Sequence, residues 1–293
     1  MKLRNLQAEA EARLRRAGLP SSEVDARRIT EQASGLDGAE LVLALDREGV
    51  TDGVVAHHDT MVARREQGEP LQYVLGCWGF RTLDLMVDER VLIPRPETEQ
   101  LVDHALVEID RLSADRPRRP METNSVAVDL GTGSGAIGLA LVAERPGVAV
   151  WAVERSADAL AVARANAAGA GRAAARVRLV EGWWFDPLPD ELRGAVDVIV
   201  ANPPYVAADA SLPDEVARWE PVDALVPGPS GLEAIQVILG GAPAWVAPGG
   251  SVLIEIGEAQ GAAVSALAGR AGFSDVEVRR DLLGRDRFLV ARS

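Results

Sequence analysis

The stretch that decides the fold is Val126-Ala127-Val128-Asp129-Leu130-Gly131-Thr132-Gly133-Ser134-Gly135. Its first half is an apolar run with the length of a buried strand, and an apolar helix is expected from Ala136 onward. The glycines between them permit a tight turn and a close approach of the backbone to a ligand. The first turn of the helix then offers N–H groups and positive potential to a carboxylate or phosphate. The segment therefore predicts a strand, a ligand-binding loop and a helix.

The residues after this segment continue the alternation of strands and helices. Strands are expected at 125–130, 148–153, 175–180, 195–201, 250–256, 275–280 and 286–292. This order predicts an α/β fold with a mainly parallel, doubly wound sheet. Only the short segment from Arg280 to Arg285 joins the last two strands, and no helix fits there. We therefore expect the sheet to end in an antiparallel pair.

The glycine-rich loop by itself does not identify its ligand. The spacing Gly131-x-Gly133-x-x-Ala136 also fits the fingerprint of dinucleotide-binding proteins. Glu154, expected at the end of the next strand, is placed to accept hydrogen bonds from both hydroxyls of a ribose. That arrangement suits NAD and S-adenosylmethionine equally, and an ordinary glycine-rich turn is the third interpretation.

A second motif, Asn202-Pro203-Pro204-Tyr205, separates these alternatives. It follows the apolar strand at 196–201, so it lies where open α/β sheets place their sites. The Asn202 side-chain oxygen and the Pro203 carbonyl can accept both N–H bonds of an NH2 group and aim its lone pair at a methyl donor. Pro203 and Pro204 stiffen the loop, and the Tyr205 ring can cover a planar group. The motif favours methyl transfer to an amide or aromatic amine over a plain Asn-Pro turn.

Composition excludes several classes of protein. The one cysteine, Cys77, excludes an internal disulfide and a multi-cysteine zinc site. The three histidines lack metal-ligand spacing, so no metal is expected, and His57-His58 is interpreted as solvated. The formal net charge of -13 disfavours a protein that depends on phosphate contacts, and it favours a basic protein or a small molecule as partner. The basic cluster Arg116 to Pro120 is interpreted as a solvated linker rather than a nucleic-acid patch.

No stretch of the sequence predicts membrane association. The longest apolar runs are far shorter than the roughly 18 residues of a membrane span. The first residues, Met1 to Asn5, have no apolar signal core, so we expect a cytoplasmic protein.

The region ahead of the sheet is expected to be a separate domain. Residues 1–70 read as helical, and Gly18 and Pro20 end the first helix. Ser22 and Asp25 form a possible capping box for the second helix. This domain either stabilises the protein or docks a substrate. Residues 71–95 have a strand-like, aromatic pattern that predicts a linking hairpin, and residues 96–293 form the main domain.

These motifs together resemble the HemK/PrmC family, the peptide chain release factor glutamine N5-methyltransferases. The Asn-Pro-Pro-Tyr motif alone is shared with methyltransferases that act on adenine in DNA or guanine in ribosomal RNA. The similarity covers essentially the whole chain, and it is most specific ahead of the sheet. The matching segments are Gly68 to Gly76, Val91 to Glu99, Gly131 to Gly135, Asn202 to Tyr205, Pro248 to Gly250, Glu255 to Gly257 and Asp281 to Arg287.

The resemblance implies a class I S-adenosylmethionine methyltransferase with a mainly parallel seven-stranded sheet and an antiparallel C-terminal strand. It implies that Gly131, Thr132, Gly133, Ser134 and Gly135 surround the methionine part of the cofactor. Glu154 would hold its ribose, and Trp184 would lie near its adenine, with Trp183 where the family often has an acidic residue. Asn202, Pro203, Pro204 and Tyr205 would hold the substrate glutamine, with Asn202 also near the cofactor.

The function implied is N5-methylation of a glutamine in the Gly-Gly-Gln loop of a release factor, with Asn202, Pro203 and Tyr205 as the catalytic residues. The acidic composition agrees with a protein partner and with no stable binding to nucleic acid. The enzymatic alternative is an amino-methyltransferase that acts on adenine N6 or guanine N2. A cofactor-binding protein without catalytic activity would leave the intact Asn202 to Tyr205 motif unexplained.

Overall fold

The computed structural model describes residues 1–113 and 125–293. These residues form two compact units. One unit comprises Met1–Trp78 with Pro213–Trp219, and the other comprises Gly79–Leu212 with Glu220–Ser293. The basic cluster Arg116 to Pro120 lies outside the described residues, so its interpretation as a linker stays a prediction.

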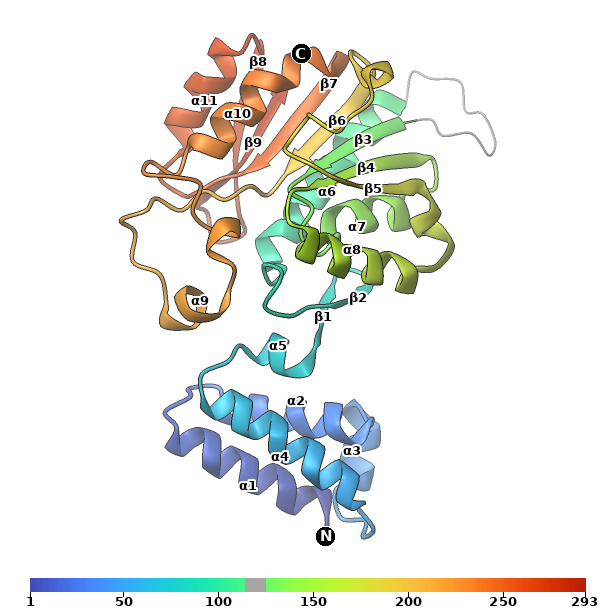
Figure 1. Cartoon of the computed structure of the whole chain (residues 1–293), viewed down its shortest axis with the longest axis vertical. Coiled ribbons are helices and arrows are strands. Elements are labelled where there is room, and N and C mark those ends of the chain that lie inside the picture. The colour runs from blue at the N-terminus through green and yellow to red at the C-terminus, as the bar shows by residue number, and fades with distance from the viewer. Residues whose placement is uncertain (114–124) are drawn as a thin grey trace. The chain divides into compact units, whose positions relative to one another are not determined.

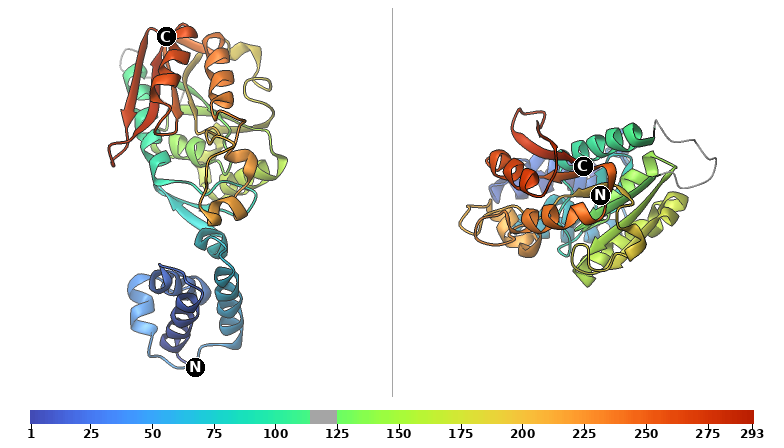
Figure 2. Two further views of the ribbon diagram at one scale, coloured as in Figure 1. Left: turned by 90° about the vertical axis from the view of Figure 1, so that its left-hand side faces the viewer. Right: turned by 90° about the horizontal axis from the view of Figure 1, so that it is seen from above.

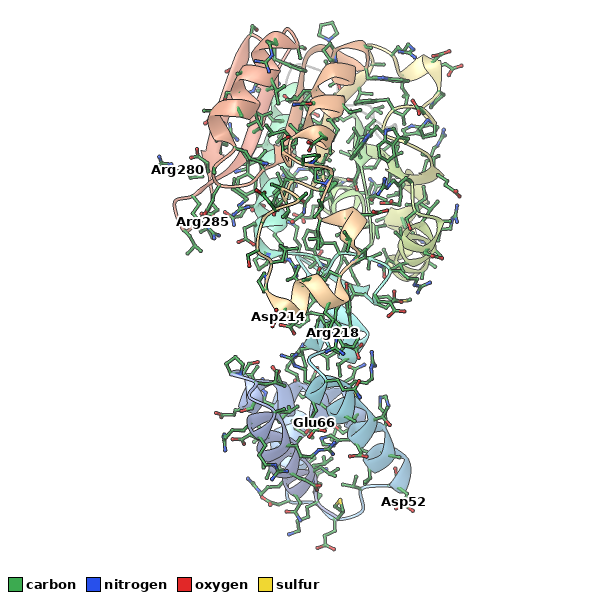
Figure 3. All side chains as sticks on the ribbon, turned by 60° about the vertical axis from the view of Figure 1, so that its left-hand side comes forward. Asp52, Glu66, Asp214, Arg218, Arg280 and Arg285 are labelled. Carbon is green, nitrogen blue, oxygen red and sulfur yellow. The ribbon has the colours of Figure 1, made fainter. Side chains whose placement is uncertain are left out.

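The first unit is helical, as the sequence predicts (Figure 1). Its core contains Leu14, Ile29, Met61 and Val74, one from each of four helices. A short helix from far along the sequence joins it, because Arg65 forms an ion pair of 2.8 Å with Glu215. The helices are α1 (Leu3–Arg16), α2 (Ser22–Ser34), α3 (Gly38–Ala44), α4 (Asp52–Glu66), α5 (Leu71–Leu75) and α9 (Asp214–Trp219). Figure 3 labels Asp52 and Glu66 at the two ends of α4, and Asp214 and Arg218 on α9.

Two local predictions in this unit are wrong. Ser22 and Asp25 do not form a capping box, since the helix is capped at Ser21 without a side-chain bond. Asp25 is buried instead, and its Oδ2 accepts a 2.7 Å bond from Arg65 Nε. His58 is not solvated, because packing of α2 against α4 buries it 3.2 Å from the Thr30 hydroxyl.

The segment expected to form a linking hairpin is partly helical. Leu71–Leu75 forms α5, which Pro70 precedes and Gly76 ends at φ +74°. In a short apolar run, the spacing of apolar residues does not distinguish a helix from a strand. Four of the five residues here are buried, which does not fit a strand with one solvent-exposed face. The strands that follow, β1 (Cys77–Phe80) and β2 (Leu83–Met86), form the expected two-stranded sheet.

The second unit contains the predicted doubly wound sheet. Its seven strands among the described residues lie in the order β5-β4-β3-β6-β7-β9-β8. The first five are parallel to one another, and β9 is antiparallel to both of its neighbours. The C-terminal strands, red in Figures 1 and 2, therefore end the sheet as predicted. The strands are β3 (Ser125–Leu130), β4 (Val148–Glu154), β5 (Val177–Glu181), β6 (Val196–Ala201), β7 (Val246–Glu255), β8 (Asp275–Arg280) and β9 (Asp286–Arg292).

Helices cover both faces of this sheet, so its central strands are buried on both sides. Val128 and Leu130 of β3 pack in one apolar cluster with α10 and α11. Ala127 of the same strand packs in the opposite cluster with α6 and α7. The α-helices of this unit are α6 (Pro96–Ser113), α7 (Ala136–Glu144), α8 (Ala157–Gly169), α10 (Glu233–Gly241) and α11 (Gly261–Arg270), with short 3-10 helices at Gly171–Arg176, Asp190–Leu192, Val222–Ala224 and Ala242–Ala244.

Among the described residues, no helix has the length and apolar character needed to cross a bilayer. The same part of the chain contains no group of three or more His, Cys, Asp or Glu side chains suited to a metal ion.

Candidate active site

The carboxyl ends of four parallel strands meet at one edge of the sheet. Leu130 of β3 is paired with Val153 of β4 on one side and with Ala201 of β6 on the other. Ala201 is in turn paired with Ile254 of β7. The residues that follow these four positions are Gly131, Glu154, Asn202 and Glu255. The strand order reverses between β3 and β6, which is where doubly wound sheets hold their ligands.

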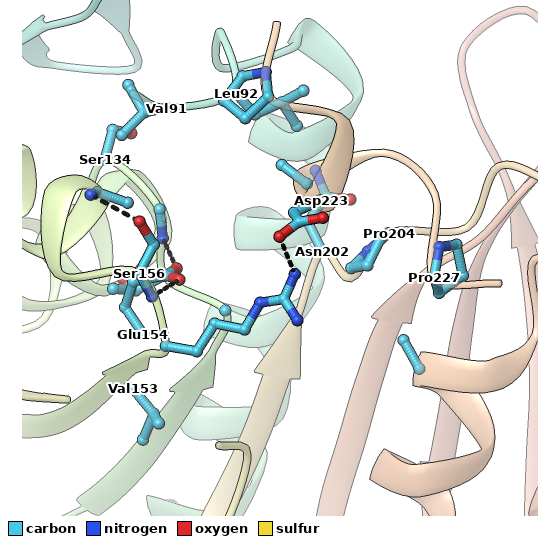
Figure 4. Close-up of a pocket in the computed structure, with 18 of the residues that line it drawn as sticks. Val91, Leu92, Ser134, Val153, Glu154, Ser156, Asn202, Pro204, Asp223 and Pro227 are labelled. Carbon is cyan, nitrogen blue, oxygen red and sulfur yellow. Dashed lines mark hydrogen bonds and ion pairs between the residues drawn. The ribbon is translucent and has the colours of Figure 1, made fainter. Parts of the chain in front are cut away.

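A cavity of about 590 Å³ lies at this edge, a size typical of sites for small molecules. In Figure 4, Glu154 and Ser156 lie on one side of it, and Asn202 and Pro204 lie on the other. Of the residues singled out in the sequence, its lining includes Gly131, Thr132, Gly133, Ser134, Glu154, Trp183, Trp184, Asn202 and Pro204. Three other residues singled out in the sequence are described by the structure but do not line the cavity: Gly135, Pro203 and Tyr205.

The glycine-rich loop has the backbone conformation that its composition predicts. Gly131, Gly133 and Gly135 have φ values of +73°, +55° and +85°, which side-chain-bearing residues rarely adopt. Asp129 holds the loop through two hydrogen bonds. Its Oδ2 accepts from the Thr132 hydroxyl and, at 3.0 Å, from the Gly138 amide. Burial raises the pKa of Asp129 to about 6. This carboxyl group therefore shapes the loop, although it is not part of the cavity lining.

Glu154 is fixed at the cavity wall by two backbone amides. Its Oε2 accepts from Gly133 N and its Oε1 from Ser156 N, both at 2.9 Å (Figure 4). A carboxylate has about four lone-pair sites, so each oxygen can still accept a further hydrogen bond. The arrangement orients the carboxylate before any ligand arrives, and its proposed contact with a ribose stays a prediction.

The two tryptophans have different surroundings. Trp184 is 9% exposed, has φ +46°, and its ring lies 3.6 Å from the position that a Cβ at Gly131 would take. Trp183 is 45% exposed, and the Arg155 guanidinium lies 4.8 Å from the centre of its ring. Arg155 also forms a 2.9 Å ion pair with Asp223 (Figure 4). Trp183 is therefore an exposed part of the cavity wall and does not point into the core.

The Asn202 side chain is held by a hydrogen-bond network at the cavity wall, where Thr98 belongs to the lining and Glu255 does not. Its Nδ2 donates to Thr98 Oγ1 at 3.1 Å, and the Thr98 hydroxyl donates to Glu255 Oε2 at 2.8 Å. The Tyr205 hydroxyl donates to the other oxygen of Glu255 at 3.2 Å. Glu255 is 1% exposed, and burial raises its pKa to about 7. Tyr205 thus contacts the back of the site, and its proposed stacking on a substrate stays a prediction.

Sequence reasoning missed Thr98 and Glu255 as functional candidates. Both lie in segments that carry the family resemblance, yet no role was assigned to either residue. A signal was available for Glu255, since a carboxyl group at the end of the apolar run Val252 to Ile254 must be buried with a partner. No local signal pointed to Thr98, because its partners come from β6 and β7, which are distant in the sequence.

The sheet order, the glycine-rich loop after β3 and the Asn-Pro-Pro-Tyr segment after β6 define a class I methyltransferase. The catalytic domain of hMettl16 in complex with a MAT2A 3'UTR hairpin has a similar fold, with a TM-score of 0.53 and 17% identity. That likeness covers 83% of this chain and 82% of the other, and at such low identity it concerns the fold alone.

The family follows from sequence comparison. Residues 5–76 match the model of the PrmC N-terminal domain, and residues 116–218 match that of the methyltransferase small domain. The chain is 42% identical to the release factor glutamine methyltransferase of Cereibacter sphaeroides, over 96% of this chain and 94% of that protein. It is 39% identical to the protein of the same description in Deinococcus radiodurans, over 100% and 99% of the two chains. The chain belongs to the release factor glutamine methyltransferase family.

Proposed function

We propose that this chain transfers a methyl group from S-adenosylmethionine to the side-chain nitrogen N5 of a glutamine in a peptide chain release factor. The acceptor is the glutamine of the Gly-Gly-Gln loop, and the reaction takes place in the cytoplasm, where release factors act. The observation that carries the proposal is the pairing of Leu130 with Ala201. This pairing supports the proposal because the glycine-rich loop and Asn202 then line the same cavity in a member of this family.

The cavity fits the proposed cofactor. The glycine-rich loop leaves room beside Gly131, where a side chain would project toward Trp184. The carboxylate of Glu154 suits two ribose hydroxyls, and the exposed ring of Trp183 suits a flat base. When bound, S-adenosylmethionine supplies a methyl group made electrophilic by a positively charged sulfur. Gly131 to Gly135, Glu154 and Trp184 are the residues proposed to hold it, with Asn202 near its methyl end.

Asn202 and Pro203 are proposed to make the amide nitrogen reactive. An amide is a poor nucleophile, since its lone pair is delocalised into the carbonyl group. Two acceptors, Asn202 Oδ1 and the Pro203 carbonyl, can take its two N–H bonds and stabilise positive charge that develops on nitrogen. The nitrogen would form its new bond to the methyl carbon, and the carbon–sulfur bond would break with its electron pair left on sulfur. The methylated nitrogen then releases a proton to water, so no strong base is needed.

The remaining segments are proposed to position the protein substrate. Residues 1–70 would dock a part of the release factor away from the acceptor glutamine. Residues 71–95 would link this domain to the catalytic residues 96–293. Pro204 and Tyr205 would complete the loop that receives the glutamine.

The test is methyl transfer from labelled cofactor to purified release factors, compared directly with DNA and RNA. Peptide mass spectrometry should find one added methyl group on the glutamine of the Gly-Gly-Gln loop. Unmodified glutamine after long incubation, together with methylated nucleic acid, would favour the base-specific alternative. Calorimetry that finds tight binding of NAD and no binding of S-adenosylmethionine or its demethylated product would reject the cofactor.

A further inference from the structure

The amide of Asn202 can be placed in two ways that differ by exchange of its oxygen and nitrogen. Only one of them suits the proposed function, because a substrate NH2 group needs an acceptor and the Asn202 NH2 group is a donor. The residues that decide between the two placements lie behind Asn202, at Thr98 and Glu255.

We propose that Glu255 is a positioning residue which, through the Thr98 hydroxyl, fixes Asn202 with its side-chain oxygen toward the substrate. The inference rests on the proposed function, since it concerns the same amide-binding site. It assigns a role to two residues that act through Asn202: Thr98, which lines the cavity, and Glu255, which does not.

The numbers of donor and acceptor groups determine the direction of each hydrogen bond in this network. A carboxylate has no proton to give, so Glu255 accepts from the Thr98 hydroxyl at 2.8 Å. A hydroxyl has one proton, so Thr98 can only accept from its other partner. Asn202 must then present Nδ2 to Thr98, at 3.1 Å, and its Oδ1 is left for the substrate.

The surroundings of Glu255 hold it in place for this task. Its second oxygen accepts from the Tyr205 hydroxyl at 3.2 Å, so donors occupy both sides of the carboxylate. The segment ahead of α6 is also fixed, because the buried Glu220 pairs with Arg95 and accepts from Ile93 N at 3.2 Å. Thr98, in the first turn of α6, therefore has little freedom to leave the network.

Protonation of Glu255 would reverse the direction of the hydrogen bonds in this network. A protonated Oε2 donates to Thr98, Thr98 then donates to Asn202 Oδ1, and Asn202 turns its NH2 group toward the substrate NH2. Burial favours the protonated form, and so does the nearby charge of Glu97 on α6. Arg287 of β9 favours the carboxylate, as do the hydroxyl groups of Thr98 and Tyr205. The pKa of Glu255, raised to about 7, places this change within the range of an activity assay.

A matched hydrogen bond elsewhere separates positioning from simple stabilisation. Ser251 of β7 donates to Glu108 of α6 at 2.8 Å, so it joins the same two elements as the Thr98–Glu255 bond does. Ser251 and Glu108 are both buried, and neither belongs to the cavity lining. Loss of this bond removes a comparable contact between α6 and β7 and leaves Asn202 untouched.

The experiment compares Thr98→Val, Thr98→Ser and Ser251→Ala with the wild type in the full chain. We expect Thr98→Val to lower kcat on a release factor by roughly tenfold to a hundredfold, with cofactor affinity changed by less than about threefold. Thr98→Ser, which keeps the hydroxyl, should restore most of the rate. Ser251→Ala should reduce the melting temperature and leave kcat near the wild-type value. Equal kcat in Thr98→Val and Ser251→Ala, with similar melting temperatures, would overturn the proposal.

A second measurement does not depend on any substrate. The side-chain NH2 signals of Asn202, identified by their loss in Asn202→Asp, should shift in NMR spectra as the pH passes through about 7. In Thr98→Val this shift should be absent. A pH-dependent shift combined with no methylation of release factors would reject the proposed function and keep the network. Wild-type signals that do not move between pH 5.5 and 8.5 and that keep the same position in Thr98→Val would reject the network even in an active enzyme.

Discussion

Leu130 of β3 and Ala201 of β6 are paired in register, so the glycine-rich loop and Asn202 leave adjacent strands at the same level. The pairing exists because β6 is inserted next to β3 on the side opposite β4. Donor and acceptor sites can then face each other across one cavity without any long loop to bring them together. The proposed chemistry depends on this geometry, and each of its parts can be tested separately.

The first prediction concerns Asn202→Ala. This change removes one of the two acceptors proposed for the substrate NH2 group, so single-turnover methyl transfer should slow by on the order of a hundredfold or more. Cofactor affinity, measured on the same preparation, should change much less. Asn202 lies at the end of a strand, so the fold should persist. A folded variant that binds cofactor and transfers methyl at the wild-type rate would reduce Asn202 to a turn-forming residue.

The second prediction concerns Glu154→Gln. Replacing the carboxylate removes the charge-assisted hydrogen bonds proposed to the ribose, so cofactor binding should weaken roughly tenfold to a hundredfold. Glu181, exposed and paired with Glu154 on the next strand, provides a control with the same change of charge. Calorimetry should find Glu181→Gln close to the wild type. Equal affinities in the two variants would mean that Glu154 only holds the loop.

The third prediction concerns Trp183→Asp, which introduces the acidic residue that the family resemblance suggests for this position. Because Trp183 is exposed in the cavity wall, the melting temperature should fall little. Cofactor affinity should stay similar or improve by up to about 1.5 kcal/mol, the worth of one ordinary hydrogen bond. A melting temperature lowered by many degrees, with no specific change in affinity, would contradict the exposed position of this ring.

The fourth prediction concerns pH and Asp129. Burial raises the pKa of this group from 3.8 to about 6 in the folded state, so the folded protein holds the proton more tightly. Its contribution to stability is complete below pH 3.8 and is lost as the pH rises through about 6. Asp129→Asn does not titrate, so it should gain stability relative to the wild type between pH 4 and pH 7. The gain should be on the order of 3 kcal/mol in urea unfolding, and parallel curves for the two proteins would exclude the raised pKa.

The fifth prediction concerns the proposed docking role of the first unit. Leu43 on α3 is 72% exposed, so Leu43→Asp should leave the fold intact. If residues 1–70 dock the substrate, this variant should raise KM for a whole release factor and leave KM for a short Gly-Gly-Gln peptide unchanged. Val107→Asp, at a 57% exposed position on α6, is the control. Unchanged KM for the whole factor would favour a purely stabilising role for the face of the first unit that carries Leu43.

The sequence by itself determined the strands, the glycine-rich loop and the type of sheet. These features depend on local patterns: the apolar run ending at Leu130, the glycines from Gly131 onward, and a connection after Arg280 too short for a helix. The position of Asn202 at a strand end could be predicted for the same reason. Local rules were less reliable where a short segment allowed two structures, as at Leu71–Leu75, and where a polar residue had a distant partner, as Asp25 has in Arg65.

Only the tertiary structure decided which strand ends are neighbours and what lies behind Asn202. Thr98 and Glu255 come from α6 and β7, and no local pattern in either segment specifies the other. The joining of Pro213–Trp219 to the first unit likewise involves contacts between distant residues, the Arg65–Glu215 ion pair and a 3.4 Å bond from Arg218 to the Gln67 carbonyl. The physical reason is that hydrophobic periodicity and turn chemistry act over a few residues. The partner of a buried carboxyl group depends instead on which distant elements pack against it.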